Sequence, residues 1–159
     1  EAEKYYETAI ANTDEPGPIM RQLIFLYIDK GETQRAIDYS DVLLDRYPDD
    51  ADIYFNIGVL FQRLTQSIYD PSVTAFNEVQ KLDSPPSSTV KELYANLRKA
   101  REYAYNARDY FLSASDLEIE VDGSSGEAAN DMKKIMKTID QMIVPGIRKF
   151  ARSNNIDLD

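Results

Sequence analysis

The side chains of this sequence that could do chemistry are mainly carboxylates. Asp38, Asp41 and Asp45 recur at i, i+3 and i+7, a spacing that places them on one face of a helix, where they could bind a cation. No glycine turn or loop makes their oxygens converge, so the solvated side of a helix is the favoured interpretation. The 159 residues include no histidine and no cysteine, which excludes an imidazole base, a Ser-His pair, a thiolate metal ligand and a disulfide.

Other patterns of known enzymes are also missing from the sequence. It contains neither G-x-G-x-x-G nor a phosphate-binding loop. With 18 basic and 28 acidic residues its net charge is -10, which argues against nucleic acid as a partner, because phosphate binding needs clustered lysine and arginine. No apolar run approaches the length of a membrane span. We therefore expect no enzyme, no metal and no cofactor, and the composition leaves the cellular compartment open.

A helical stripe that occurs twice, 34 residues apart, organises the first part of the chain. Tyr54, Ile57, Gly58 and Phe61 fall at i, i+3, i+4 and i+7, and the earlier copy is Met20, Leu23, Ile24 and Tyr27. Glycine within a helix costs about 1 kcal/mol relative to alanine, so Gly58 predicts the close approach of a neighbouring helix. A second pattern of small, large and medium residues occurs four times, at Ala2, Tyr6, Ala9; Ala36, Ser40, Leu43; Ser72, Phe76, Val79; and Ala107, Phe111, Ala114. Together the two patterns indicate a repeat protein.

The order of these residues resembles the tetratricopeptide repeat (TPR). The resemblance covers roughly residues 1–120 and is strong for 17–50, where the stripe is followed by Gly31, Ala36, Leu43 and Pro48. The second unit departs from the pattern, with Thr65 or Gln66 in place of a glycine turn and Ser84 in place of the closing proline. The resemblance implies an all-α fold, a right-handed superhelix of antiparallel helix pairs, A and then B, with a long third-unit helix and a C-terminal capping helix.

We expect a single TPR-like domain over residues 1–159. Its expected parts are helix B of a truncated unit over 1–14, unit 1 over 17–50, unit 2 over 51–86, a long helix of unit 3 over 87–122 and capping helices over 127–152. Unit 2 should consist of helices over 51–68 and 72–82, joined by a turn at Asp70-Pro71-Ser72, because proline breaks a helix. The long helix either replaces both helices of a third hairpin or is a spacer that continues into its helix B.

Several boundaries are predicted from local residue types. Gly31 should cap one helix, Asp49-Asp50 should begin the next, and Pro145-Gly146 should end the capping helix before a short helix over 147–152. Residues 116–122 are interpreted as a fraying helix end in preference to a strand. Residues 123–126 read as a flexible loop with the composition of an engineered linker, and 154–159 as a loose tail. Because the sequence starts within a repeat, we expect either more chain before residue 1 or a second copy packed there.

The resemblance implies a module that binds a peptide or a helix of another protein in a concave groove lined by A helices. Residues of the A helices that lie off the packing stripe would line it: Arg21, Phe25, Ile28, Asp52, Phe55, Asn56, Val59, Gln62 and Arg63. The alternative for the apolar members is that the chain's own helices cover them. Arg21 and Asn56 match positions of the clamp by which some TPR proteins bind a chaperone's C-terminal carboxylate, but Phe25 replaces its other asparagine, so the clamp is incomplete.

A different class of function is structural assembly. The chain would then self-associate, as a homodimer through the uncovered first helix or through the apolar face of 135–143. A ligand-binding or enzymatic domain built on helical hairpins is the remote third hypothesis.

Overall fold

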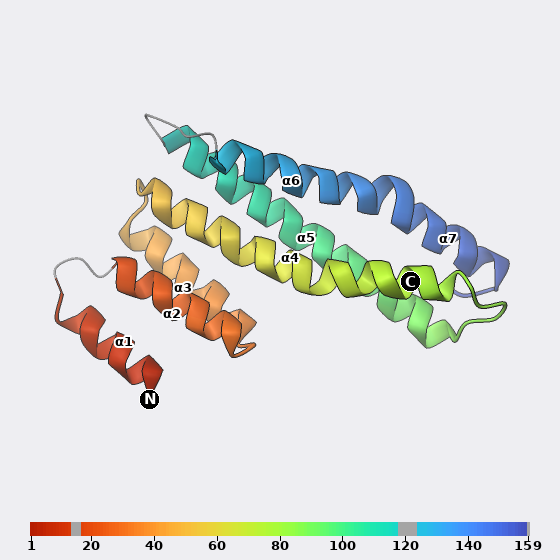
Figure 1. The fold of residues 1–159 in the computed structure, drawn as a ribbon, viewed down its shortest axis with the longest axis horizontal. Coiled ribbons are helices and arrows are strands. Elements are labelled where there is room, and N and C mark those ends of the chain that lie inside the picture. Colours follow the sequence, from red (N-terminus) through yellow and green to blue (C-terminus); the bar gives the residue numbers. More distant parts are fainter. Residues whose placement is uncertain (14–16, 118–123, 159) are drawn as a thin grey trace.

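The computed structural model describes residues 1–13, 17–117 and 124–158, and this part of the chain is all-helical, as expected (Figure 1). Its elements are α1 (Ala2–Ala11), α2 (Gly17–Asp29), α3 (Thr33–Arg46), α4 (Ala51–Val79), α5 (Ser87–Leu117), α6 (Ser124–Thr138), the π-helical turn η1 (Ile139–Ile143) and α7 (Val144–Ser153). The predicted turn at 14–16 and most of the segment 116–122 lie outside the described residues.

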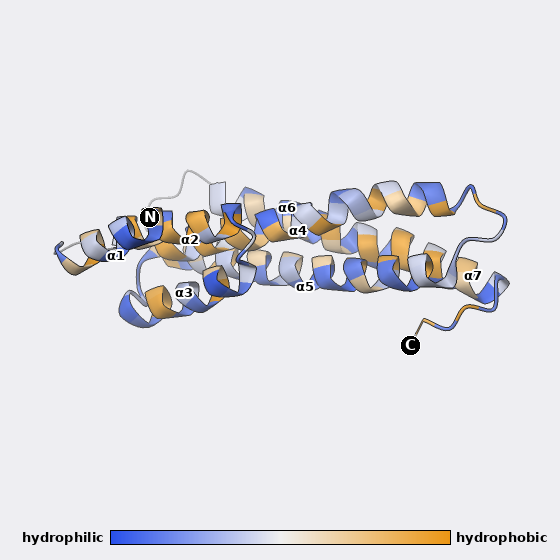
Figure 2. Ribbon diagram, turned by 90° about the horizontal axis from the view of Figure 1, so that it is seen from below, coloured by the Kyte–Doolittle hydropathy of each residue, from blue (hydrophilic) through white to orange (hydrophobic). Residues whose placement is uncertain are grey.

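Three long helical segments form the body of the molecule. Figure 1 shows α4, α5 and the continuous segment α6–η1–α7 side by side, with α5 antiparallel to both of the others. The short helices α2 and α3 pack against the first half of α4, and α1 packs on α2. Hydrophobic residues are concentrated in α2 and α4, between their neighbours, whereas α3 and α5 are more hydrophilic (Figure 2). None of the described helices is long and apolar enough to cross a membrane.

Seven of the eight residues of the two predicted stripes are buried. All four residues of the first stripe are at most 4% exposed, and Ile57, Gly58 and Phe61 of the second are buried too, with Tyr54 half-buried beside Tyr110. The expected close approach at Gly58 is confirmed, because a Cβ added there would lie 2.6 Å from Cδ1 of Phe111 in α5. Gly58 therefore lets the Phe111 ring sit directly on the α4 backbone.

Local residue types place two helix ends correctly. Gly31 has a φ of 74° and follows α2, where its N–H donates to Ile28 and the N–H of Glu32 donates to Tyr27, which is a Schellman motif. At the start of α4 the carboxylate of Asp50 accepts a hydrogen bond of 3.2 Å from the N–H of Ile53.

The predicted turn at Asp70-Pro71-Ser72 is wrong, because α4 continues through Pro71 to Val79. Its antiparallel partner is α5, not residues 72–82. The buried face of α4 extends past the proline to Ser72 and Val79, so packing on α5 outweighs the local cost of proline in a helix, about 3 kcal/mol.

The long helix predicted over 87–122 is a single element, α5, over its described residues 87–117. Each residue of its predicted apolar face is buried: Leu93, Leu97, Ala100, Ala104, Ala107, Phe111 and Ala114. Because Phe111 touches Gly58, the second half of α5 packs on the stripe of α4.

Two predicted features of the C-terminal part are wrong. Residues 124–126 form the first turn of α6 and not a loop, with Ser125 fully buried; Gly123 lies outside the described residues. Pro145-Gly146 does not end the helix, because η1 widens the backbone and the N–H of Val144 donates to Ile139, five residues earlier. The lack of a side chain at Gly146 admits Phe76 of α4, whose Cζ would lie 2.7 Å from an added Cβ.

The predicted loose tail is also wrong for its described part. Asn155 has a φ of 54°, and the N–H of Ile156 donates to Ala151 over 2.9 Å, a helix-ending motif usually built with glycine. Ile156 and Leu158 then pack on the apolar cluster formed by α5, η1 and α7. Burial of these two side chains holds the tail against the bundle.

Candidate functional site

The predicted groove residues lie along two neighbouring helices, α2 and α4. Arg21 and Asp52 form an ion pair between the helices, with 3.5 Å between Nη1 and Oδ2. One turn further along α4, the amide of Asn56 donates to the backbone carbonyl of Asp52 over 2.5 Å. The two helices are therefore joined at this end by polar side chains that are partly or fully exposed.

Phe25 and Arg63 make the second contact between α2 and α4. The guanidinium carbon of Arg63 lies 4.9 Å from the centroid of the Phe25 ring, a cation–π arrangement. Phe25 is half-buried and Arg63 is exposed, with Gln62 half-buried beside it. We call Arg21, Phe25, Asp52, Asn56, Gln62 and Arg63 the α2–α4 strip.

The other three predicted groove residues have a different environment. Ile28, Phe55 and Val59 are half-buried and pack against the hydrophobic core. The ring of Phe55 lies 5.4 Å from that of Phe111, centroid to centroid. For Phe55 the structure favours the alternative that the chain's own helices cover it, because Phe111 of α5 lies against its ring.

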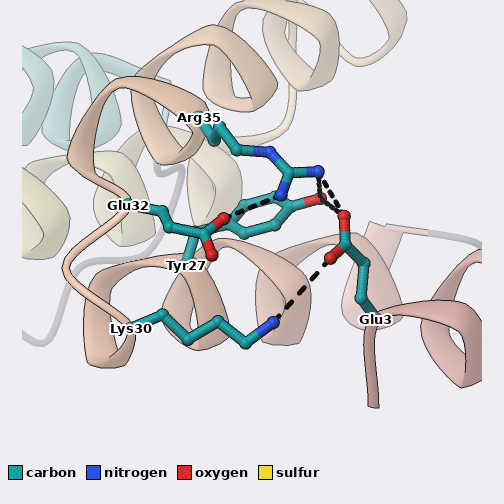
Figure 3. A network of polar contacts seen from close by, with 5 residues as sticks. All are labelled: Glu3, Tyr27, Lys30, Glu32 and Arg35. Atoms are coloured by element: carbon teal, nitrogen blue, oxygen red, sulfur yellow. Dashed lines mark hydrogen bonds and ion pairs between the residues drawn. The ribbon is translucent and has the colours of Figure 1, made fainter. Parts of the chain in front are cut away.

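A polar network ties α1 to α2 and α3 (Figure 3). The carboxylate of Glu3 accepts hydrogen bonds from the Tyr27 hydroxyl, over 3.0 Å, and from the guanidinium of Arg35, and it lies 3.7 Å from the ammonium of Lys30. Arg35 also donates to Glu32 over 2.7 Å, and its guanidinium carbon lies 4.5 Å from the centroid of the Tyr27 ring. Sequence reasoning missed this network, because residues 24 and 32 positions apart carry no local signal of contact.

The network shifts the pKa values of its members in a direction that stabilises the fold. The guanidinium of Arg35, and then the Tyr27 hydroxyl, hold the pKa of Glu3 below its usual value by hydrogen bonding to the carboxylate. Burial, followed by the hydrogen bond to Glu3, raises the pKa of Tyr27 to about 12. At neutral pH the carboxylate is charged and the phenol neutral, so the network holds helices together and offers no group poised for proton transfer.

The Tyr27 shift predicts a loss of stability in alkali. The pKa of Tyr27 in the folded protein lies above its ordinary value of 10.0. The phenol's contribution to the free energy of unfolding is therefore complete below pH 10 and is lost as the pH rises through about 12. The loss should be on the order of 2 kcal/mol. Urea denaturation between pH 9 and 12 measures it, and Tyr27→Phe should lose less stability over this range than the wild type. Tyr5→Phe is the matched control, because Tyr5 is 76% exposed; equal alkaline losses in all three proteins would contradict the prediction.

The carboxylate row of α3 is solvent-exposed. Asp38, Asp41 and Asp45 are all exposed, in agreement with the prediction that they form the solvated face of a helix. Asp38 accepts a hydrogen bond from the side-chain amide of Gln34. Within residues 1–13, 17–117 and 124–158, no group of acidic side chains is arranged to hold a metal ion.

No protein-family model, no curated protein and no solved structure matches the sequence. A function for this chain is therefore inferred from the arrangement of its own residues.

Proposed function

We propose that this chain is a TPR-like interaction module, and that its α2–α4 strip binds an extended peptide or a helix of another protein. The observation that carries the proposal is the arrangement at Phe25, a half-buried aromatic ring on α2 with the exposed guanidinium of Arg63 from α4 over its face. Polar groups of Arg21 and Asn56 lie on the same pair of helices. An apolar anchor point beside hydrogen-bonding side chains is typical of protein-binding surfaces.

The burial pattern supports a TPR-like origin for the surface. Residues 34 positions apart in α2 and α4 are buried in equivalent places, as at Leu23 and Ile57 or Ile24 and Gly58. Helices α2 and α4, the expected A helices of units 1 and 2, bury equivalent stripes and therefore also have equivalent unburied faces. The α2–α4 strip is the accessible part of these faces. The continuous α4 and α5 lengthen the second helix pair well beyond an ordinary repeat.

A partner could use the strip in a specific way. Arg63 is exposed, so its guanidinium can leave the Phe25 ring at little cost and give its place to an apolar side chain of the partner. The freed guanidinium, together with Arg21 and the amide of Asn56, would then donate to the partner's carbonyl or carboxylate oxygens. The proposal thus predicts ligands with an apolar residue next to acceptor groups.

Variants of the strip test this proposal. Peptides are selected from a random display library on the immobilised protein, and their Kd is measured with Phe25→Ala combined with Asn56→Ala. The double variant should raise Kd about tenfold or more, because truncated anchor residues typically cost over 1 kcal/mol each. Far-ultraviolet circular dichroism should be unchanged, since both side chains are partly exposed.

The matched control is Tyr105→Ala with Leu112→Ala, two side chains of α5 that are 44% and 45% exposed. It removes a similar amount of exposed apolar surface away from the strip and should leave Kd unchanged. Selected peptides that bind the strip variant as tightly as the wild type, or that lose affinity only in the control, would refute the proposal.

Self-association is the second candidate function, and it is favoured by the outer side of α1. No residue of α1 is buried, and Tyr5 is 76% exposed. The other surface considered, 135–143, is less suitable, because Ile139 and Ile143 are buried in the bundle. Sedimentation over a concentration series should show a dimer that Tyr5→Ala weakens, and a strict monomer at high concentration would exclude this function.

A further inference from the structure

A polar cleft between α4 and α5 lies at Pro71, away from the α2–α4 strip. It has a volume of about 310 Å³, at the lower end of the range for small-molecule sites. Polar lining groups come from Ser67 and Ser72 of α4 and from Thr89, Glu92 and Asn96 of α5, and aliphatic side chains complete the walls. The proposed peptide-binding function makes no use of this cleft.

One hydroxyl in the cleft stands out among the buried polar groups. Among the described residues the buried serines and threonines are Ser40, Thr65, Ser72 and Ser125. Ser40 and Thr65 each donate to the carbonyl four residues earlier, and Ser125 also has an interaction. Ser72 is 3% exposed and has no hydrogen-bond partner within the described ranges. An unpaired buried hydroxyl is costly, so we expect a partner from outside the chain.

Pro71 removes the helical hydrogen-bond donor from the backbone carbonyl of Ser67, a residue that lines the same cleft. Proline has no N–H, so the carbonyl of Ser67 receives no hydrogen bond from the residue four positions later, as it would in an ordinary helix. Glu92 contributes an exposed carboxylate that forms no ion pair with the described residues. A carbonyl and a carboxylate only accept hydrogen bonds, and a serine hydroxyl can accept as well. The cleft residues therefore include three acceptor groups, one of them negatively charged, beside the Thr89 hydroxyl and the Asn96 amide, which can also donate.

We propose that this cleft binds a primary ammonium group, carried by a small free amine or by a lysine side chain. An ammonium has three donors, which match the Ser67 carbonyl, the Ser72 hydroxyl and the Glu92 carboxylate, and its alkyl chain suits the aliphatic walls. A bare divalent metal is a poorer match, because the cleft contains a single carboxylate. The net charge of -10 also attracts cations to the protein.

An NMR titration of the whole chain tests the proposal with n-butylamine as the probe. At neutral pH the amine should give saturable shifts confined to amides around Ser72, Thr89 and Asn96, whereas n-butanol and butyrate should not, up to about 10 mM. Glu92→Gln and Ser72→Ala should each raise the Kd for butylamine about tenfold. Thr74→Ala is the matched control, because the Thr74 hydroxyl is exposed and bonds to the carbonyl of Asp70.

Stability separates lost binding from lost folding. Ser72→Ala removes an unpaired buried hydroxyl, so its Tm should be equal to or above that of the wild type while butylamine binding falls. Nα-acetyl-lysine amide distinguishes the two sources, because tighter binding than butylamine indicates a lysine side chain and weaker binding a free amine. The proposal is overturned if butanol binds as well as butylamine, if the shifts spread over the acidic surface without saturating, or if Ser72→Ala binds as tightly as the wild type. An ordered water on Ser72 without amine binding would equally refute it.

Discussion

Replacing Gly58 by valine should lower the free energy of unfolding by about 3 kcal/mol and the Tm by about 10 °C. Even the first added carbon would lie 2.6 Å from the ring of Phe111, closer than carbon atoms approach in folded proteins. The ring cannot move away easily, because Phe111 is fully buried. Gly58→Ala should have a smaller effect, about 1–2 kcal/mol, since the gain of about 1 kcal/mol in helix propensity offsets part of the overpacking.

Urea denaturation measures these losses, and Gly126→Val is the matched control. Nothing lies within 4 Å of a Cβ added at Gly126, so this change should alter stability by about 0.5 kcal/mol or less. Combining Gly58→Ala with Phe111→Leu tests the contact itself, because the double variant should lose less stability than the sum of the two single changes. Two results would show that the close contact between α4 and α5 does not cause the loss of stability: additive losses in the double variant, or equal losses for the valine variants of Gly58 and Gly126.

Replacing Pro71 by alanine should raise the free energy of unfolding by about 2 kcal/mol. Proline in a helix interior costs about 3 kcal/mol relative to alanine, and its restriction of the unfolded chain returns up to about 1 kcal/mol of that. Alanine at this position supplies an N–H for the carbonyl of Ser67 and removes the proline ring from α4. The same change should weaken butylamine binding, because the Ser67 carbonyl would then be engaged within the helix.

Pro145→Ala is the matched control for this prediction. Pro145 directly follows the π-helical turn η1, whose widened backbone already accommodates the missing N–H, so its replacement should change stability by about 0.5 kcal/mol or less. Thermal and urea denaturation give the comparison. A decrease in stability for Pro71→Ala would mean that the shape imposed by proline fits α4 to α5, and that the proline stabilises the tertiary structure.

The α2–α4 strip shows the limit of sequence reasoning about the site. Position relative to the packing stripe predicts that Arg21, Phe25 and Asn56 line a groove, and in the structure all three are half-buried on α2 and α4. Position relative to the stripe could not distinguish these three residues from Phe55 and Val59, which pack against the core. The exposure of a residue outside the stripe depends on where α5 lies. The cleft at Pro71 was missed for the same reason, since its walls come from α4 and α5 and meet only in the folded chain.

What the sequence determined by itself is local. A 3.6-residue period sets which face of a helix is apolar, so the predicted stripes of α2, α4 and α5 are buried except at Tyr54, which is half-buried. Gly31 and Asp50 act within one turn of the backbone, so the helix ends that they make were predicted as well.

Only the tertiary structure decided which helices continue and what they pack against. Proline within a helix locally favours a break by a few kcal/mol, but burial of a continuous apolar face against α5 contributes more to the free energy of folding. Helix α4 therefore continues through Pro71, and the π-helical turn η1 accommodates Pro145 without ending the helix. Likewise, Ile156 and Leu158 hold the tail in place through contacts with residues far away in the sequence. Local preferences set the faces of the helices, and the larger free energy of long-range burial sets their lengths and partners.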